Sequence, residues 1–124
     1  MNRSETKLYV IGAGFAGQMI ANDIKRKKIF GKVTAFLDDD KNLIGSEIDK
    51  IPVLGPIDDI ALVLNPSPGD QAILAIPTAG VERIRAIYER LKQSGFETIK
   101  ILPSISQVVN GTAHLVQARE IDPL

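Results

Sequence analysis

The segment Lys7-Leu-Tyr-Val-Ile-Gly-Ala-Gly-Phe-Ala-Gly17 decides the fold of this chain. It starts with an apolar, β-favouring run, typical of a buried parallel strand, and ends in a G-x-G-x-x-G sequence. The following residues, from 15 to about 28, place a set of small and apolar side chains on one helical face: Ala16, Gly17, Ile20, Ala21 and Ile24. A strand, a glycine-rich turn and a helix in this order predict the first half of a βαβ unit.

Strand-like and helix-like segments alternate along the rest of the chain. Further strands are expected at 32–37, 51–55, 71–76 and 98–102, with helices at 57–64 and 81–94. This order predicts an α/β fold, a doubly wound parallel sheet (Rossmann-like) with strand order 3-2-1-4-5. We expect a loop at 41–50, one or two helical turns at 104–109, and an extra C-terminal strand at 113–118.

Length and composition restrict the classes of protein. The 124 residues fit one domain over 1–124, and 15 basic residues balance 15 acidic ones. Because a nucleic-acid module usually carries a basic excess, we expect no nucleic-acid partner. The chain has no cysteine and a single histidine, His114, so we expect no metal site. No apolar run is long enough to cross a membrane, so we expect no direct membrane contact.

The three glycines of the motif have separate expected roles in a dinucleotide-binding turn. Gly12 permits the tight turn, Gly14 lacks a Cβ and so admits a pyrophosphate, and Gly17 lets the helix lie close to the sheet. The backbone N–H groups at this helix start, including those of Phe15 and Ala16, are expected to face the phosphate. The alternative is that these glycines serve only close packing and that the turn binds no ligand.

Asp38 completes the fingerprint, because it lies 21 residues past Gly17 at the end of the second predicted strand. Its carboxylate is expected to accept hydrogen bonds from ribose hydroxyls and to repel a 2′-phosphate. NAD therefore fits better than NADP, with a UDP-sugar or another nucleotide as alternatives. The alternative for the acidic run is a solvated turn in which Asp39 or Asp40 caps the chain.

Other polar segments give weaker indications. Pro77 and Thr78 follow the fourth strand, where the second half of a ligand would rest. For Thr78 we favour the other interpretation, in which its side chain caps the next helix. The basic run Lys25–Lys28 is interpreted as a solvated helix end, with phosphate or membrane contact as the alternative. Tyr88 and Lys92 have the spacing of the short-chain dehydrogenase pair, but Tyr88 lies on the apolar face of its helix. We therefore expect no catalytic residue in this chain.

Several stretches together resemble the N-terminal Rossmann domain of membrane-anchored bacterial nucleotide-sugar dehydratases, epimerases and dehydrogenases of polysaccharide and glycan biosynthesis. They are Val10–Gly17, Ala35–Asp40, Ile51–Gly55, Ala75–Thr78 and Arg119–Leu124. The resemblance implies a non-catalytic, cytoplasmic, nucleotide-binding domain excised from a longer chain. It implies transmembrane helices before this domain and a catalytic short-chain-dehydrogenase domain after it, as a partner.

The resemblance carries over Gly12, Gly14, Gly17 and Asp38 as nucleotide-binding residues, and it departs at Lys50, where many relatives have glycine. Two other functions stay open. An NAD(H)-sensing domain of a redox-responsive transcriptional repressor has similar glycine, aspartate and Ile-Pro-Val stretches. The second open function is a scaffold that binds no ligand and forms a homo-oligomer.

Overall fold

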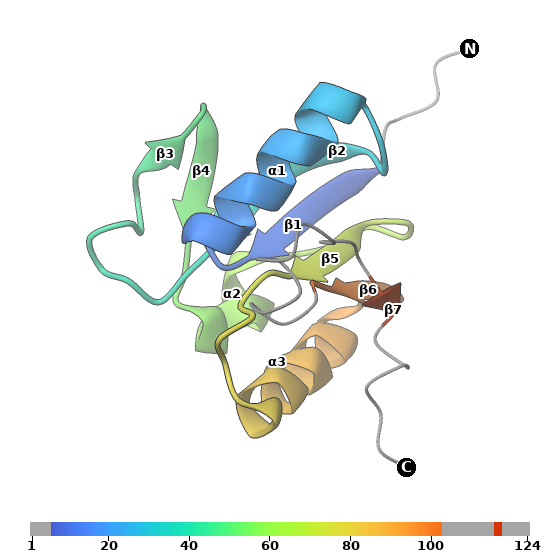
Figure 1. Ribbon diagram of the computed structural model, residues 1–124. Helices are drawn as coiled ribbons and strands as arrows, with labels where there is room; N and C mark the ends of the chain where they lie inside the picture. Colours follow the sequence, from blue (N-terminus) through green and yellow to red (C-terminus); the bar gives the residue numbers. More distant parts are fainter. Residues whose placement is uncertain (1–5, 103–115, 118–124) are drawn as a thin grey trace.

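The computed structural model describes residues 6–102 and 116–117, which form one sheet with helices on both faces (Figure 1). The strands occur in the order β3-β4-β2-β1-β5-β6-β7. Their bounds are β1 Lys7–Ile11, β2 Lys32–Leu37, β3 Glu47–Ile48, β4 Ile51–Leu54, β5 Gln71–Leu74, β6 Thr98–Ile101 and β7 Val116–Gln117. The helices are α1 Phe15–Lys27, the 3-10 helix η1 Ile57–Asp59, α2 Ile60–Val63 and α3 Val81–Ser94.

The parallel part of the sheet confirms the predicted strand order. β4, β2, β1, β5 and β6 are neighbours in that order, and all their pairings are parallel. β7 pairs antiparallel with β6, so the extra C-terminal strand is present at Val116–Gln117. The rest of the predicted strand, the helical turns at 104–109, His114 and the stretch 119–124 lie outside the described residues.

The prediction of a loop over 41–50 is wrong in its last part, because β3 forms an antiparallel hairpin with β4. The two residues that join these strands, Asp49 and Lys50, both have positive φ, 53° and 68°. A two-residue turn of this kind follows the twist of the strands and favours glycine. The departure at Lys50 therefore leaves the turn in place but puts a lysine in a left-handed conformation.

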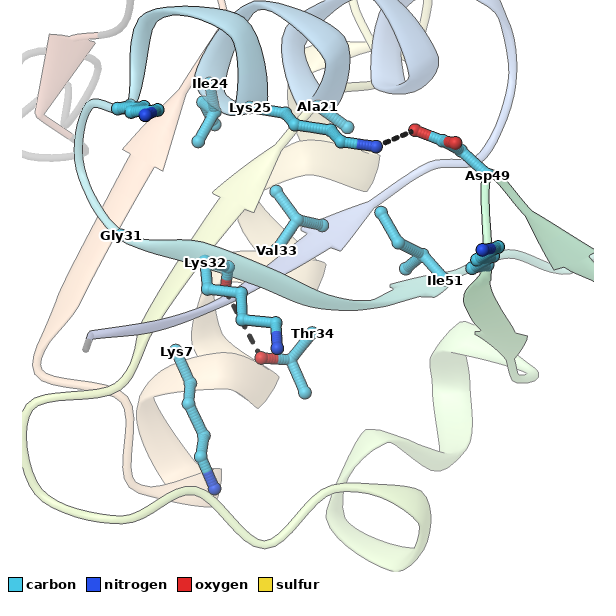
Figure 2. A pocket seen from close by; sticks show the side chains of 12 residues that line it. Lys7, Ala21, Ile24, Lys25, Gly31, Lys32, Val33, Thr34, Asp49 and Ile51 are labelled. Carbon is cyan, nitrogen blue, oxygen red and sulfur yellow. Dashed lines mark hydrogen bonds and ion pairs between the residues drawn. The ribbon is translucent and has the colours of Figure 1, made fainter. Parts of the chain in front are cut away.

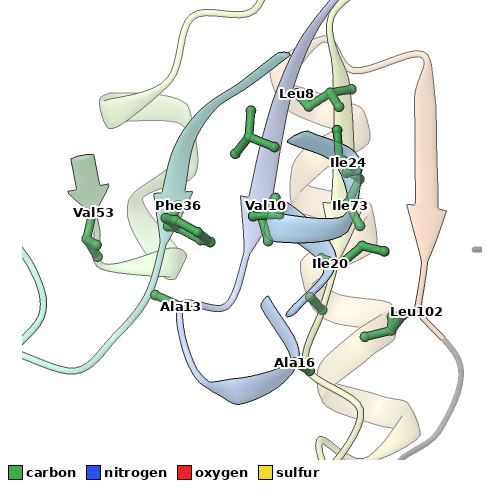
Figure 3. Packing of buried hydrophobic residues seen from close by; sticks show 13 residues of the cluster. Leu8, Val10, Ala13, Ala16, Ile20, Ile24, Phe36, Val53, Ile73 and Leu102 are labelled. Atoms are coloured by element: carbon green, nitrogen blue, oxygen red, sulfur yellow. The ribbon is translucent and has the colours of Figure 1, made fainter. Parts of the chain in front are cut away.

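On one face of the sheet, α1 packs with the apolar stripe expected from the sequence. Ile20 and Ile24 lie against Val10, Phe36 and Ile73 of three neighbouring strands (Figure 3). The helix ends at Lys28, whose φ of 55° lets its N–H return to the carbonyl of Ile24. This packing sets the start of α1 at the carboxyl end of β1.

On the other face, α2, α3 and η1 cover a second apolar cluster, in which Ile87 and Leu91 of α3 are fully buried. Gly95, with φ of 113°, ends α3 as predicted. Tyr88 is half-buried against this cluster, in agreement with its expected place on the apolar face. None of the helices in the described part of the chain has the length and apolar character needed to cross a membrane.

Candidate functional site

The glycine-rich turn joins the end of β1 to the start of α1, and two of its glycines are required by the packing. Gly12 has φ of +112°, and a Cβ there would lie 2.6 Å from the carbonyl oxygen of Ala75. Its N–H donates to the carbonyl of Leu37 at 2.6 Å, which fixes the turn to the end of β2. A Cβ on Gly17 would overlap the carbonyl oxygen of Gly12. Both residues therefore have the structural roles that the motif predicts.

Gly14 is different, because it is exposed and a Cβ on it would meet no atom within 4 Å. Its φ of −85° is open to any residue, so neither backbone strain nor packing demands glycine. The first helical bond of α1 runs from the N–H of Gln18 to the carbonyl of Gly14 at 3.0 Å. The N–H groups of residues 15–17 thus have no acceptor within the helix, and the first turn contains no acidic residue. The positive end of α1 lies next to open space, which suits an anion.

Asp38 contacts the turn directly through the backbone N–H of Ala13. One carboxylate oxygen accepts the N–H of the fully buried Ala13 at 2.7 Å, and the other accepts the N–H of Asp40 at 2.9 Å. The side-chain Nε2 of Gln18 donates a hydrogen bond to the carbonyl of Ala13 at 2.9 Å. Gln18 was not among the site residues predicted from the sequence. Ala13, between the first two glycines, is therefore held both at its N–H and at its carbonyl. A carboxylate offers about four acceptor positions, so Asp38 keeps capacity for ribose hydroxyls.

The carboxylates of the next two acidic residues, Asp39 and Asp40, accept backbone N–H groups. This is the capping role that the alternative interpretation of the acidic run gives them. Asp39 accepts the N–H of Ile57 at 2.7 Å, and Asp40 accepts the N–H of Asn42 at 2.9 Å. The other carboxylate oxygen of Asp39 accepts a hydrogen bond from Nη2 of Arg83 at 3.1 Å. The acidic run therefore joins the end of β2 to η1 and α3.

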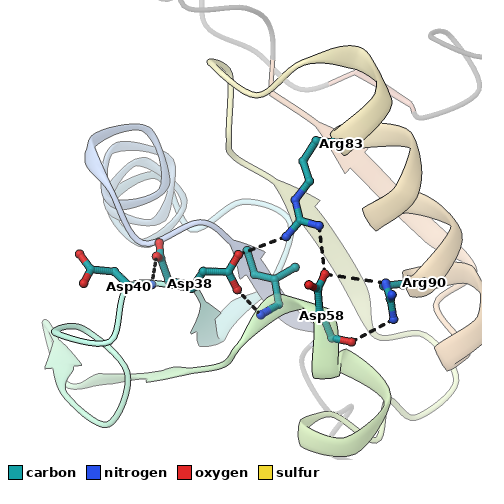
Figure 4. A network of polar contacts seen from close by, with 7 residues as sticks. Asp38, Asp40, Asp58, Arg83 and Arg90 are labelled. Carbon is teal, nitrogen blue, oxygen red and sulfur yellow. Dashed lines mark hydrogen bonds and ion pairs between the residues drawn. The ribbon is translucent and has the colours of Figure 1, made fainter.

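Arg83 also donates Nη1 to Asp58 at 3.0 Å, and Arg90 donates Nη1 to the carbonyl of Asp58 at 3.0 Å (Figure 4). The hydrogen bond and charge of the Arg83 guanidinium hold the pKa of Asp58 below its ordinary value, with a smaller contribution from Arg90. This network has no signal in the sequence, because its members lie 25 to 44 residues apart and only the fold brings them together.

Pro77 and Thr78 lie in the loop after β5, at the same edge of the sheet as the glycine-rich turn. The N–H of Ala75 donates to the carbonyl of Ile11 at 2.8 Å, which keeps the start of this loop beside β1. Pro77 is half-buried and Thr78 is exposed. The N-cap of α3 is Gly80, and no side chain caps the helix, so the favoured prediction that Thr78 caps it is wrong.

Two apolar side chains at this edge are open to a ligand. Phe15, the first residue of α1, is 74% exposed, and Val81, the first residue of α3, is 64% exposed. Ala16 is buried, so only its backbone N–H is available to a ligand. In the described ranges, no group of three or more carboxylates or histidines is arranged to hold a metal ion. The edge therefore offers backbone donors, one carboxylate and apolar contacts.

Comparisons with known proteins agree with this geometry. The model of a family described as CoA binding domain matches residues 3–105. A probable polysaccharide biosynthesis protein of Bacillus subtilis (strain 168), EpsC, is 26% identical over 119 residues. That alignment covers 95% of this chain and 20% of EpsC, so the chain spans about a fifth of the length of this relative.

Solved structures with the same fold include two different proteins. UDP-D-quinovosamine 4-dehydrogenase from Vibrio fischeri superposes with a TM-score of 0.76 at 25% identity, over 96% of this chain and 97% of that chain. RSP, a Rex-family repressor, gives a TM-score of 0.68 at 24% identity, over 82% of this chain and 47% of that one. RSP has also been solved with β-NADH, with a TM-score of 0.66. The predicted Rossmann-like fold and the resemblance to polysaccharide and nucleotide-sugar enzymes are confirmed.

Proposed function

Because the chain belongs to the CoA binding domain family, we propose that it binds the diphosphate of a nucleotide at the glycine-rich turn, and that this nucleotide is NAD(H). The open space at Gly14, next to the uncapped start of α1, carries the proposal. A pyrophosphate there would receive the N–H groups of residues 15–17 and the favourable end of the helix dipole. CoA and NAD share an adenosine diphosphate part, so the family match and this site agree on the chemistry.

The choice of NAD(H) over other nucleotides depends on Asp38. Its carboxylate lies at the end of β2, beside the turn, where the adenosine ribose of a dinucleotide rests in this fold. A negative charge there favours free ribose hydroxyls and opposes a ribose that carries a phosphate, as in NADP and CoA. That RSP, a protein of the same fold, has been solved with NADH supports this choice.

The wider role follows the relatives that this chain resembles. We propose that it is the non-catalytic nucleotide-binding domain of a nucleotide-sugar dehydratase, epimerase or dehydrogenase of polysaccharide biosynthesis. Its partner would be a catalytic short-chain-dehydrogenase domain, and the parent protein would be anchored in the cytoplasmic membrane. The names of the Vibrio and Bacillus proteins support the sugar and polysaccharide context. An NAD(H)-sensing role has only the fold in its favour, since RSP is 24% identical.

Calorimetric titration with NAD(H), NADP(H), CoA and a UDP-sugar tests the proposal, with Gly14→Val as the variant whose turn is blocked. We expect NAD(H) to bind most tightly and to lose binding in Gly14→Val. A thermal-shift series gives an independent readout, because a ligand at a hundred times its Kd stabilises the fold by about 2.7 kcal/mol. Tighter binding of CoA would overturn the NAD(H) assignment, and equal binding in both proteins would overturn the turn as the phosphate site.

A further inference from the structure

Arg83 forms an ion pair that spans the end of the central strand β1. It lies in the first turn of α3, which follows β5, whereas its partner Asp39 follows β2. In the sheet, β1 lies between β2 and β5, so the bond from Nη2 to the Asp39 carboxylate at 3.1 Å spans the carboxyl end of β1. Figure 4 shows the Arg83 side chain reaching from α3 toward the end of β2. The glycine-rich turn starts from this same end of β1.

The turn and Arg83 border the end of β1 from opposite faces of the sheet. The turn continues into α1 on one face, while α3 packs on the other. The acidic residues after β2 follow the same division, because Asp38 bonds Ala13 of the turn and Asp39 bonds η1 and α3. Ligands of open α/β sheets lie outside the carboxyl ends of the strands, where the strand order reverses. Here it reverses between β1 and β5, so a nucleotide at the turn has Arg83 on its other side.

The Arg83 guanidinium is held at two of its edges. Nη1 donates to Asp58 at 3.0 Å, and Nη2 donates to Asp39 at 3.1 Å. All N–H groups of a guanidinium point outward in its plane, so these bonds use its edges and leave its faces without a hydrogen-bond partner. The side chain is nevertheless 39% exposed. Arg83 therefore offers a flat cationic surface whose orientation is already fixed.

Charge decides which part of a nucleotide this surface suits. The positive charge of Arg83 is offset by the carboxylates of Asp39 and Asp58, so a phosphate gains little from it. The uncapped start of α1 suits the phosphate better. An aromatic base is uncharged, and guanidinium groups stack on aromatic faces. Neighbouring Cα atoms are about 3.8 Å apart, so a base joined to a ribose at Asp38 is within reach of the guanidinium that Asp39 holds.

We propose that Arg83 is the base-binding residue of the nucleotide site, with the face of its guanidinium stacked on the base and with Asp39 and Asp58 as positioning residues that fix its plane. This inference rests on the proposed nucleotide site and completes it: the diphosphate lies at the turn, the ribose at Asp38 and the base at Arg83. For NAD(H) this base is the adenine. Every base has a π-face, so Arg83 contributes affinity for the base while Asp38 selects the ribose.

The test compares ADP with inorganic pyrophosphate, which has the diphosphate without ribose or base. Arg83→Lys keeps the positive charge and removes the planar group, so ADP affinity should fall by about 3- to 30-fold in calorimetry. Pyrophosphate affinity should stay within about twofold of wild type, because the charge that acts on it is unchanged. In the wild type, ADP should also move the proton resonance of Arg83 Nε–H upfield through the ring current of the stacked base. Pyrophosphate has no ring and should not.

Two variants serve as controls. Arg85→Lys is the matched one, because it makes the same substitution at an exposed arginine of the same helix, outside the network. Lys25→Gln removes an exposed ion pair between two other elements, the one with Asp49 at 3.0 Å, at the amino ends of the strands and away from the turn (Figure 2). Both should keep ADP affinity within about twofold of wild type, since they alter only distant, screened charge.

The outcomes separate this inference from the site on which it rests. A loss of ADP affinity in Arg83→Lys alone, together with the upfield shift in the wild type, supports the base contact. An unchanged ADP affinity in Arg83→Lys, an equal loss for pyrophosphate, or an equal loss in Arg85→Lys overturns it. ADP binding to the wild type without the upfield shift also overturns it, independently of any variant, and leaves the turn as the phosphate site. If neither probe binds the wild type, the proposed nucleotide site itself is overturned.

Discussion

Removal of the Asp38 carboxylate tests whether this residue holds the turn, reads the ribose, or does both. In Asp38→Ala, the N–H of the fully buried Ala13 loses its acceptor at 2.7 Å, and the N–H of Asp40 loses the acceptor at 2.9 Å. A buried donor left without a partner costs about 1–3 kcal/mol, and the second, exposed bond contributes about 0.5–1.5 kcal/mol. We therefore expect the free energy of unfolding to fall by about 2–4 kcal/mol.

The conservative variant separates the two roles of Asp38. Asp38→Asn keeps one oxygen that can accept from Ala13, so its stability loss should be about half that of Asp38→Ala. It removes the charge that opposes a ribose phosphate, so the preference for NAD(H) over NADP(H) should shrink. In Asp38→Ala, NAD(H) affinity should fall by about one to two orders of magnitude, since a charge-assisted bond is worth about 1.5–3 kcal/mol.

Urea denaturation measures the stability of each variant, and calorimetry with both cofactors measures the preference. Asp40→Ala is the matched control, because it removes a single hydrogen bond from an exposed residue of the same loop. An unchanged urea midpoint for Asp38→Ala would refute the role of the carboxylate in the turn. An unchanged ratio of NAD(H) to NADP(H) affinity in Asp38→Asn would refute its role at the ribose.

Four other changes have expected outcomes. Gly14→Val should abolish NAD(H) binding in calorimetry and lower the free energy of unfolding by no more than about 1 kcal/mol, because a Cβ there meets no protein atom within 4 Å and only the N-cap preference of α1 is lost; a larger loss of stability would contradict this. Gly17→Ala should lower the free energy of unfolding by about 1–3 kcal/mol, because its Cβ overlaps the carbonyl of Gly12; a stability equal to wild type would show that α1 moves at no cost. Lys50→Gly should raise the free energy of unfolding by about 1 kcal/mol, since glycine removes the left-handed cost at φ of 68°; a lower urea midpoint would show that the lysine side chain supports the turn. The stability from the pair of Asp58 and Arg83 should be present above about pH 4, the ordinary pKa of aspartate, and be lost as the pH falls through the lowered pKa of Asp58. Carboxyl NMR should show that pKa rise in Arg83→Gln, and an unchanged value would exclude the guanidinium as its cause.

The parallel sheet could be predicted from the sequence because its signals are local. Residues 72–74 form a short apolar run, and residues 98–101 alternate polar and apolar side chains. Each such segment is separated from the next by a helical stripe or a turn cluster. The glycine motif and Asp38 were equally accessible, since a parallel sheet brings the ends of its first two strands together. β3 was not predicted, because two residues are too few to show a periodicity. It is a strand only because it pairs with β4.

The polar contacts around the turn could not be predicted in the same way. In the sequence Gln18 is an ordinary helical residue, and only the folded turn places the carbonyl of Ala13 2.9 Å from its amide nitrogen. Arg83 acquires its role only when α3 packs beside η1 and the end of β2.

The double hold on Ala13 has a consequence for the energetics of recognition. A loop that must order itself around a ligand loses conformational entropy on association, and that loss lowers affinity. Here Asp38 and Gln18 fix the turn in the free protein, so little backbone freedom remains to be lost. Such preorganisation should let a ligand associate at an encounter-limited rate, without a slow rearrangement step, and variants of either side chain should introduce one.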